Sequence, residues 1–127
     1  KGELMKAFNI KDGYGKAHLK EKGVVPAIIT GRSSTILENR CNELGITELH
    51  QGVEDKVKKL YIVCEKYHIT PKQVAYIGDD LNDLDCMRVC RYTAAPADAV
   101  EEVRKSVDFV CKHNGGEGAV REFIDQL

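Results

Sequence analysis

The sequence predicts an α/β protein built on a doubly wound parallel sheet, and three observations support this fold class. Short apolar runs alternate with segments of helical period along the chain, as expected for strands joined by crossover helices. The runs at residues 24–29 and 74–77 are continuous rather than alternating, which is typical of parallel strands covered on both faces. The 127 residues, 43% of them hydrophobic, suit a single domain with an ordinary core.

The first half of the chain predicts three strands and three helices. Residues 1–10 alternate loosely and indicate an irregular strand, which could form half of a hairpin with a mate upstream. Asp12 is the expected N-cap of a helix over residues 13–22, which Gly23 ends. The next predicted elements are a strand at 24–29, a helix at 34–44 closed by Gly45, a strand at 46–49 and a helix at 56–67. In the helices at 34–44 and 56–67, the side chains expected to face the core are Ile36, Leu37, Cys41, Leu44, Val57, Leu60, Ile62, Val63 and Cys64.

The second half repeats the alternation around the strand at residues 74–77. Thr70 and Pro71 predict an N-cap followed by a proline at the first position of a brief helical turn before that strand. After it we expect a helix at 84–91, a strand at 92–95, a helix capped by Asp98 and reaching residue 105, a strand at 107–111, a glycine-rich turn at 114–118 and a last helix at 119–127.

Composition narrows the class of function. Nineteen basic and twenty acidic residues leave a net charge of -1, so the overall balance favours neither a nucleic acid nor an anionic membrane as partner. No apolar run approaches the ~20 residues of a membrane span, and no secretory leader opens the chain; we therefore expect the cytoplasm. The five cysteines are odd in number and scattered, which favours reduced, mostly buried thiols over a zinc site.

The segment 74–83 combines a buried strand with an acidic turn. Gly78 permits a tight turn after the strand, and Asp79, Asp80 and Asp83 follow within five residues. Three carboxylates so close together repel one another, and hard oxygen ligands suit Mg²⁺, so the spacing favours a metal site. The alternative is that these acids only cap a helix and complement its dipole.

Two further polar groups should lie at the same edge of the sheet, where ligands of open α/β sheets collect. Thr30 and Gly31 follow the strand at 24–29 and could form an anion cradle, although a plain turn is an alternative. Lys56 opens a helix, where a cation opposes the dipole, so its ammonium could point at an anion instead of solvent. Together with the acidic turn, these residues predict a phosphate-plus-Mg²⁺ site.

These residues resemble the signature motifs of the haloacid dehalogenase superfamily of phosphohydrolases. Residues 28–32, Lys56 and residues 78–83 are similar to its second, third and fourth motifs in order and spacing. Residues 6–9, 12–15, 51–52 and 115–122 resemble the capless 3-deoxy-D-manno-octulosonate 8-phosphate (KDO 8-phosphate) phosphatases and related nonulosonate 9-phosphate phosphatases. The resemblance covers the whole chain and implies a Rossmann-like haloacid dehalogenase fold without a large cap domain, one phosphatase-like domain over residues 1–127.

The resemblance also implies roles for matching residues. Thr30, Lys56 and Asp80 would be catalytic: Thr30 would bind the phosphoryl group, Lys56 would neutralise charge, and Asp80 would orient Lys56 or the metal shell. Asp79 would bind Mg²⁺ and Asp83 would hold a metal-bound water. The residues expected to bind the substrate, a small sugar acid phosphate, are Gly31, Arg32, Asn82 and Arg121. Arg32 is the candidate for the carboxylate because a guanidinium matches its geometry; for Arg121 a plain surface charge is the alternative. The family often assembles as a homotetramer.

One family motif has no match. The family's Asp-x-Asp pair, which supplies the nucleophile and the acid/base on the central strand, is not found after a buried strand here. Asp12 follows an irregular polar segment and cannot replace it. We therefore expect an N-terminally truncated chain that lacks this central strand, holds half of a metal site and is inactive alone.

Three alternatives to a KDO 8-phosphate phosphatase stay open. A nonulosonate (KDN or sialic acid) 9-phosphate phosphatase would use the same motifs. A non-catalytic tetramerisation domain of a CMP-sialic acid synthetase would share the fold, but need not keep Thr30, Lys56, Asp79 and Asp83. A receiver-like signalling domain would not need the Thr-Gly-Arg turn or the glycine-rich tail.

Overall fold

The computed structural model describes residues 4–5 and 15–127, and the following account concerns these residues. The strands are β1 (Leu4–Met5), β2 (Val25–Ile29), β3 (Glu48–His50), β4 (Ala75–Ile77), β5 (Tyr92–Ala95) and β6 (Phe109–Val110). The α-helices are α1 (Lys16–Lys22), α2 (Thr35–Leu44), α3 (Lys56–Lys66), α4 (Leu84–Val89), α5 (Glu101–Ser106) and α6 (Ala119–Ile124). Two short 3-10 helices are η1 (Pro71–Gln73) and η2 (Leu81–Asp83). The alternation predicted from the sequence is confirmed.

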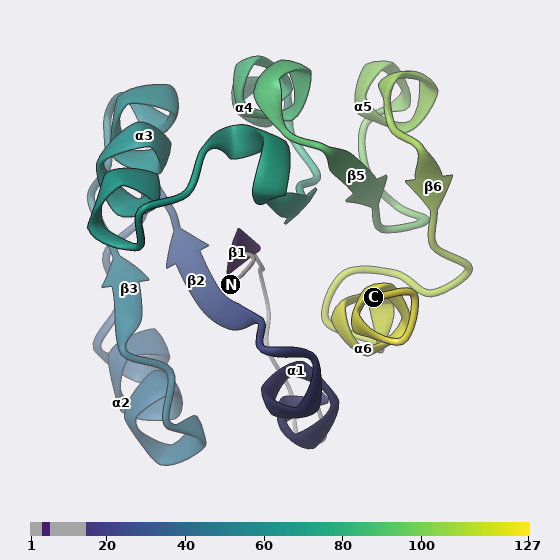
Figure 1. The fold of residues 1–127 in the computed structure, drawn as a ribbon. Coiled ribbons are helices and arrows are strands. Elements are labelled where there is room, and N and C mark those ends of the chain that lie inside the picture. Colours follow the sequence, from purple (N-terminus) through teal and green to yellow (C-terminus); the bar gives the residue numbers. More distant parts are fainter. Residues whose placement is uncertain (1–3, 6–14) are drawn as a thin grey trace.

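The strands form two parallel three-stranded sheets, with the orders β1-β2-β3 and β4-β5-β6. β1 pairs with the start of β2, where Leu4 is opposite Val25, and it also contacts β4. The two sheets thus meet along β1 and β4 and form one twisted layer (Figure 1). All pairings in the described residues are parallel, so the carboxyl ends of the strands lie at one common edge.

Helices cover both faces of this layer. Figure 1 shows α3, α4 and α5 on one face and α1, α2 and α6 on the other. Each face has its own buried cluster: Leu60, Cys86 and Val103 belong to the first, and Leu19, Phe123 to the second. The continuous apolar runs predicted for β2 and β4 are explained by this arrangement, because successive residues of a strand point to opposite faces and both are covered.

Several predicted helix ends are confirmed. The Ser34 side chain accepts a hydrogen bond from the Leu37 N–H at 3.2 Å, and Gly45 ends α2 in the left-handed conformation. Thr70 and Gln73 form a capping box around Pro71, which opens η1. These signals could be found in the sequence because each depends on a local contact within three or four residues.

Other local predictions were wrong. α1 begins at Lys16 behind Gly15 rather than at residue 13 behind Asp12, which lies outside the described residues. Val100, not Asp98, precedes α5, and the Asp98 carboxylate accepts a hydrogen bond from the Gly115 N–H instead. Ile36 is 82% exposed and Ile62 48% exposed, because each lies at the border of its helix's apolar face, where tertiary packing decides burial.

The N-terminal segment contains a short strand, as the sequence predicted. Residues 4–5 form a parallel strand beside β2 and next to β4, which is the place the sequence left to a missing central strand. The other residues of the predicted strand at 1–10 lie outside the described part. Within the described residues, no helix has the length and apolarity required to cross a membrane. None of the five cysteines forms a disulfide and all five are buried, as expected for reduced thiols.

Candidate functional site

Asp83 is the centre of the polar cluster at the carboxyl edge of the sheet. It is fully buried, at 0% exposure, and four donors from the described residues reach its two oxygens. Oδ1 accepts from the Lys56 ammonium at 3.0 Å and from the Tyr76 hydroxyl at 2.6 Å. Oδ2 accepts from the backbone N–H groups of Asp79 and Asp80, both at 3.2 Å. A buried carboxylate requires such partners, since desolvation without them is costly.

Gly78 allows Asp83 to lie this close to the turn. A Cβ atom at Gly78 would stand 2.7 Å from Cβ, Cγ and Oδ2 of Asp83, closer than atoms pack in protein interiors. The sequence suggested a glycine for the turn, and the structure gives the reason: the buried carboxylate occupies the space of a side chain.

Lys56 is the first residue of α3 and is 6% exposed. Its ammonium donates to Asn82 Oδ1 at 3.2 Å as well as to Asp83. Asp55, the N-cap of α3, accepts from the Lys58 N–H at 3.0 Å and fixes the start of the helix. The structure therefore brings together Lys56, Asn82 and Asp83, and it places a buried positive charge at the edge where ligands bind.

Thr30 follows β2 at the same edge and is 2% exposed. Its backbone bonds on both sides: its N–H donates to the His50 carbonyl at 2.9 Å, and its carbonyl accepts from the Val53 N–H at 3.0 Å. Its hydroxyl accepts from the Arg32 N–H at 3.2 Å. These bonds fix the turn after β2 against the loop that leads to α3, so Thr30 and Lys56 are held by one connected segment.

Asp79 and Asp80 have different environments. Asp79 is half-buried directly after the β4 strand and its backbone is anchored to Asp83. Asp80 is exposed, and its Oδ1 accepts from the Leu81 N–H at 2.7 Å at the start of η2. Asp80 thus performs the capping that the sequence offered as an alternative for the acidic turn. Among the described residues, no group of three acidic, histidine or cysteine side chains assembles into a metal site.

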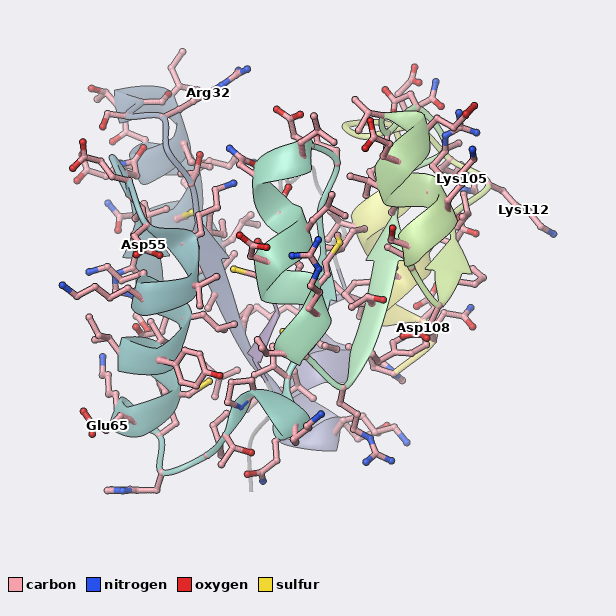
Figure 2. The ribbon with its side chains drawn as sticks, turned by 90° about the horizontal axis from the view of Figure 1, so that it is seen from above. Arg32, Asp55, Glu65, Lys105, Asp108 and Lys112 are labelled. Carbon is pink, nitrogen blue, oxygen red and sulfur yellow. The ribbon has the colours of Figure 1, made fainter. Side chains whose placement is uncertain are left out.

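The two predicted arginines lie at the periphery. The Arg32 side chain is exposed and extends outward from the turn after β2 (Figure 2). It lies toward the same end of the molecule as Asp55, opposite Glu65. Arg121 is exposed on α6, where its Nε donates to Asp125 Oδ1 at 3.2 Å. Neither arginine has a described side-chain contact with Thr30, Lys56 or the acidic turn.

The glycine-rich turn adjoins the acidic turn. A small cavity of about 10 Å³ is bordered by residues of both, including Asp79 and Gly115. Glu122 anchors the segment before the turn, because its carboxylate accepts from the backbone N–H groups of Lys112 and His113. Burial alone would raise the pKa of Glu122, but these bonds and the His113 side chain outweigh burial and lower the pKa.

Tyr76 is the residue of this cluster that the sequence prediction treated only as part of a buried strand. Burial first, and then the charge of Asp83, raise the pKa of its hydroxyl far above the usual value, so the hydroxyl stays protonated and donates. The sequence did contain one signal for this role, a single hydroxyl group in an otherwise apolar strand. A buried tyrosine hydroxyl needs a hydrogen-bond partner.

The comparisons with known proteins agree with this fold. The sequence profile of the haloacid dehalogenase-like hydrolases matches residues 47–124, and the chain belongs to this family. The 3-deoxy-D-manno-octulosonate 8-phosphate phosphatase of Escherichia coli is 44% identical over 126 residues, which are 99% of this chain and 67% of the relative. The corresponding phosphatase of Yersinia pestis has the same identity and coverage.

Solved structures show the same similarity. The 3-deoxy-D-manno-octulosonate 8-phosphate phosphatase of Moraxella catarrhalis, in complex with magnesium, phosphate and KDO, has a TM-score of 0.88 at 34% identity. The match covers 99% of this chain and 84% of that one. The cobalt-bound phosphatase of Haemophilus influenzae has a TM-score of 0.88 at 30% identity, with 99% and 85% covered.

Proposed function

We propose that the protein hydrolyses the phosphate ester of a keto-sugar acid, 3-deoxy-D-manno-octulosonate 8-phosphate, in a Mg²⁺-dependent reaction. The observation that supports this most directly is the buried Lys56 ammonium, fixed by Asp83 at the carboxyl edge of the sheet. A buried cation at this edge is suited to an anionic substrate. The 44% identity to the phosphatase of Escherichia coli indicates which phosphate ester it is.

Each described residue contributes a specific interaction in this proposal. The Thr30 hydroxyl donates a hydrogen bond to a phosphoryl oxygen, while the Arg32 N–H fixes the hydroxyl oxygen from behind. Lys56 neutralises charge that builds up during phosphoryl transfer, and Asn82 helps to hold its ammonium. Gly31 leaves room for the substrate beside Thr30. An aspartate nucleophile outside the described residues forms the aspartyl-phosphate.

Asp79 fits the role of a direct Mg²⁺ ligand. Its backbone is fixed by Asp83, and its half-buried carboxylate is a hard oxygen donor, as Mg²⁺ prefers. Asp83 is engaged by protein donors, so it supports the site indirectly, through Asp79 and through water. Polarisation of the phosphoryl oxygens is the chemistry that a bound Mg²⁺ supplies at such a site. One or two carboxylates are enough for this ion, which keeps several waters.

The test compares hydrolysis of three phosphate esters by the full-length gene product. KDO 8-phosphate should give the highest kcat/KM, a nonulosonate 9-phosphate a lower value, and a simple aryl phosphate the lowest. A higher value for the nine-carbon ester would replace the proposed substrate. If none of the three is hydrolysed with Mg²⁺ present, the non-catalytic assembly domain becomes the better explanation.

Arg32→Ala tests how the sugar acid is recognised. If Arg32 binds the carboxylate, its removal should raise KM for the keto-acid phosphate by about 10- to 100-fold, the value of one charge-assisted pair. Hydrolysis of the aryl phosphate, which has no carboxylate, should change less than threefold. Equal losses on both substrates would contradict this role. Arg121→Ala is the parallel variant for the glycine-rich side of the site.

The remaining parts of the proposal concern assembly and location. We propose a homotetramer in the cytoplasm, in which the glycine-rich segment at residues 114–118 and Arg121 close the site beside a neighbouring subunit. Gly115 and Asp79 border the same small cavity, which supports closure of the site by the glycine-rich segment. Light scattering of the purified protein should give four times the subunit mass, and a monomer with full activity would exclude a contribution from neighbours.

A further inference from the structure

The Tyr76 side chain connects the sheet to the polar cluster around Asp83. Tyr76 is the middle residue of β4 and is 0% exposed. Its ring packs in the cluster beneath α3 and α4, and its hydroxyl reaches Asp83 Oδ1 at 2.6 Å. The other three described donors to Asp83 come from α3 and from the turn after β4. Tyr76 is thus the described donor that holds Asp83 from within the sheet.

Two donors share one oxygen of Asp83. The Tyr76 hydroxyl and the Lys56 ammonium both donate to Oδ1, whereas Oδ2 serves the turn backbone. The hydrogen bond from the Tyr76 hydroxyl disperses part of the negative charge on Oδ1. The attraction between Oδ1 and the Lys56 ammonium is therefore weaker than it would be without this bond. Removal of the hydroxyl should therefore draw Lys56 into a closer pair with Asp83 and neutralise more of its charge.

From this geometry we propose that Tyr76 is a positioning residue for the hydrolysis. Its hydroxyl moderates the Lys56–Asp83 pair, so that the ammonium keeps charge for the phosphoryl group, and it fixes the carboxylate to which the backbone of Asp79 is bound. This inference rests on the proposed function of the site as a phosphatase centre. It does not depend on which sugar acid phosphate is the substrate.

Tyr76→Phe removes the hydroxyl and keeps the buried ring. Tyr67→Phe is a matched control, because the Tyr67 hydroxyl also donates to a buried carboxylate, that of Glu48, at the C-terminal end of α3. Each variant loses one hydrogen bond to a charged group, so similar decreases in melting temperature are expected. With both proteins folded at the assay temperature, Tyr76→Phe should lower kcat about tenfold with KM changed less than threefold, and Tyr67→Phe should leave kcat within twofold.

Inorganic phosphate provides a measurement that does not depend on turnover. Calorimetry in the presence of Mg²⁺ should show phosphate binding about five- to tenfold weaker in Tyr76→Phe and unchanged in Tyr67→Phe. A purely structural Tyr76 would lower the melting temperature while kcat and phosphate affinity stay at the wild-type values, and that result would overturn the inference.

A double-mutant cycle tests whether Tyr76 acts through Lys56. In a Lys56→Met background, Tyr76→Phe should lower kcat by less than twofold if moderation of the Lys56–Asp83 pair is its main role; the full tenfold loss there would overturn that role. An aryl phosphate is the substrate for all these measurements. If the wild type hydrolyses it but not KDO 8-phosphate, the proposed substrate fails, whereas the comparison of tyrosine variants remains valid.

Discussion

Two buried carboxylates in this molecule are held by the same pair of residue types, and they differ in what surrounds them. Asp83 accepts from Lys56 and Tyr76, and Glu48 accepts from Lys66 and Tyr67, with His50 as a third partner. The Lys56 side chain is 5% exposed, whereas the Lys66 side chain is 63% exposed.

The difference in lysine exposure distinguishes the candidate anion-binding site at Asp83 from the structural contact at Glu48. Lys66 can be hydrated on its outer side, so its pair with Glu48 mainly ties α3 to β3. Lys56 lacks that hydration and lies at the carboxyl edge of the sheet, where an incoming anion can replace the missing solvent. The same pair of residue types therefore stabilises the fold at one place and prepares an anion site at the other. Four predictions test this distinction.

The largest expected effect concerns removal of each negative charge. Asp83→Asn should lower the free energy of unfolding by about 3–5 kcal/mol, because it breaks the buried ion pair between Lys56 and Asp83. Glu48→Gln should cost only about 1 kcal/mol, since Lys66 is exposed and solvated. Urea denaturation of both variants measures the difference. Equal losses would show that the exposure of the lysine does not decide the energetics.

The two lysines should differ as strongly in activity. Lys56→Met should lower kcat for an aryl phosphate by about 10²- to 10³-fold, as expected when one group that stabilises transition-state charge is removed. Lys66→Met, the matched control, should keep kcat within threefold. Steady-state kinetics on the folded variants measure this difference in kcat. A comparable loss of kcat in Lys66→Met would contradict the assignment of Lys66 to a purely structural contact.

Gly78 tests how tightly the Asp83 cluster is packed. Gly78→Ala places a methyl group 2.7 Å from three atoms of Asp83 and should destabilise the protein by about 1–3 kcal/mol. Gly31→Ala is the control for stability, because among the described residues its new Cβ would meet just the Val53 carbonyl oxygen, at 3.4 Å. Thermal melts should rank Gly78→Ala well below Gly31→Ala; the reverse order would contradict the packing described around Asp83.

The smallest expected effect is the pH dependence that Glu48 adds to stability. Burial would raise the pKa of Glu48, but its bonds to Lys66, Tyr67 and His50 outweigh burial and lower the pKa below the ordinary 4.5. A lowered pKa in the folded state contributes stability above pH 4.5, and this contribution is lost as the pH falls through the folded-state pKa. Unfolding measured from pH 6 to 3 should therefore converge for wild type and Glu48→Gln toward the acid end. A constant difference over this range would exclude the linkage.

Local signals in the sequence predicted much of the fold and several of the polar residues at the carboxyl edge of the sheet. Gly45 and the Thr70-Pro71 pair defined helix ends in the sequence because their contacts lie within one turn. Thr30, Lys56 and the acidic turn could be assigned to one edge because carboxyl ends of parallel strands meet there. The prediction failed for Asp98, whose partner is the N–H of Gly115, 17 residues away, and for Ile36, whose exposure depends on neighbouring elements.

The sequence by itself determined the α/β alternation, the parallel sheet and the set of polar residues that follow its strands. Only the tertiary structure decided the environment of each acid in the turn. Asp80 caps η2, Asp79 is half-buried, and Asp83 is enclosed by Lys56, Tyr76 and the turn backbone. The physical reason is that spacing along the chain specifies which edge a carboxylate reaches. Whether it is buried, and which donors reach each of its oxygens, depends on residues from separate elements that meet only when the sheet and its helices pack together.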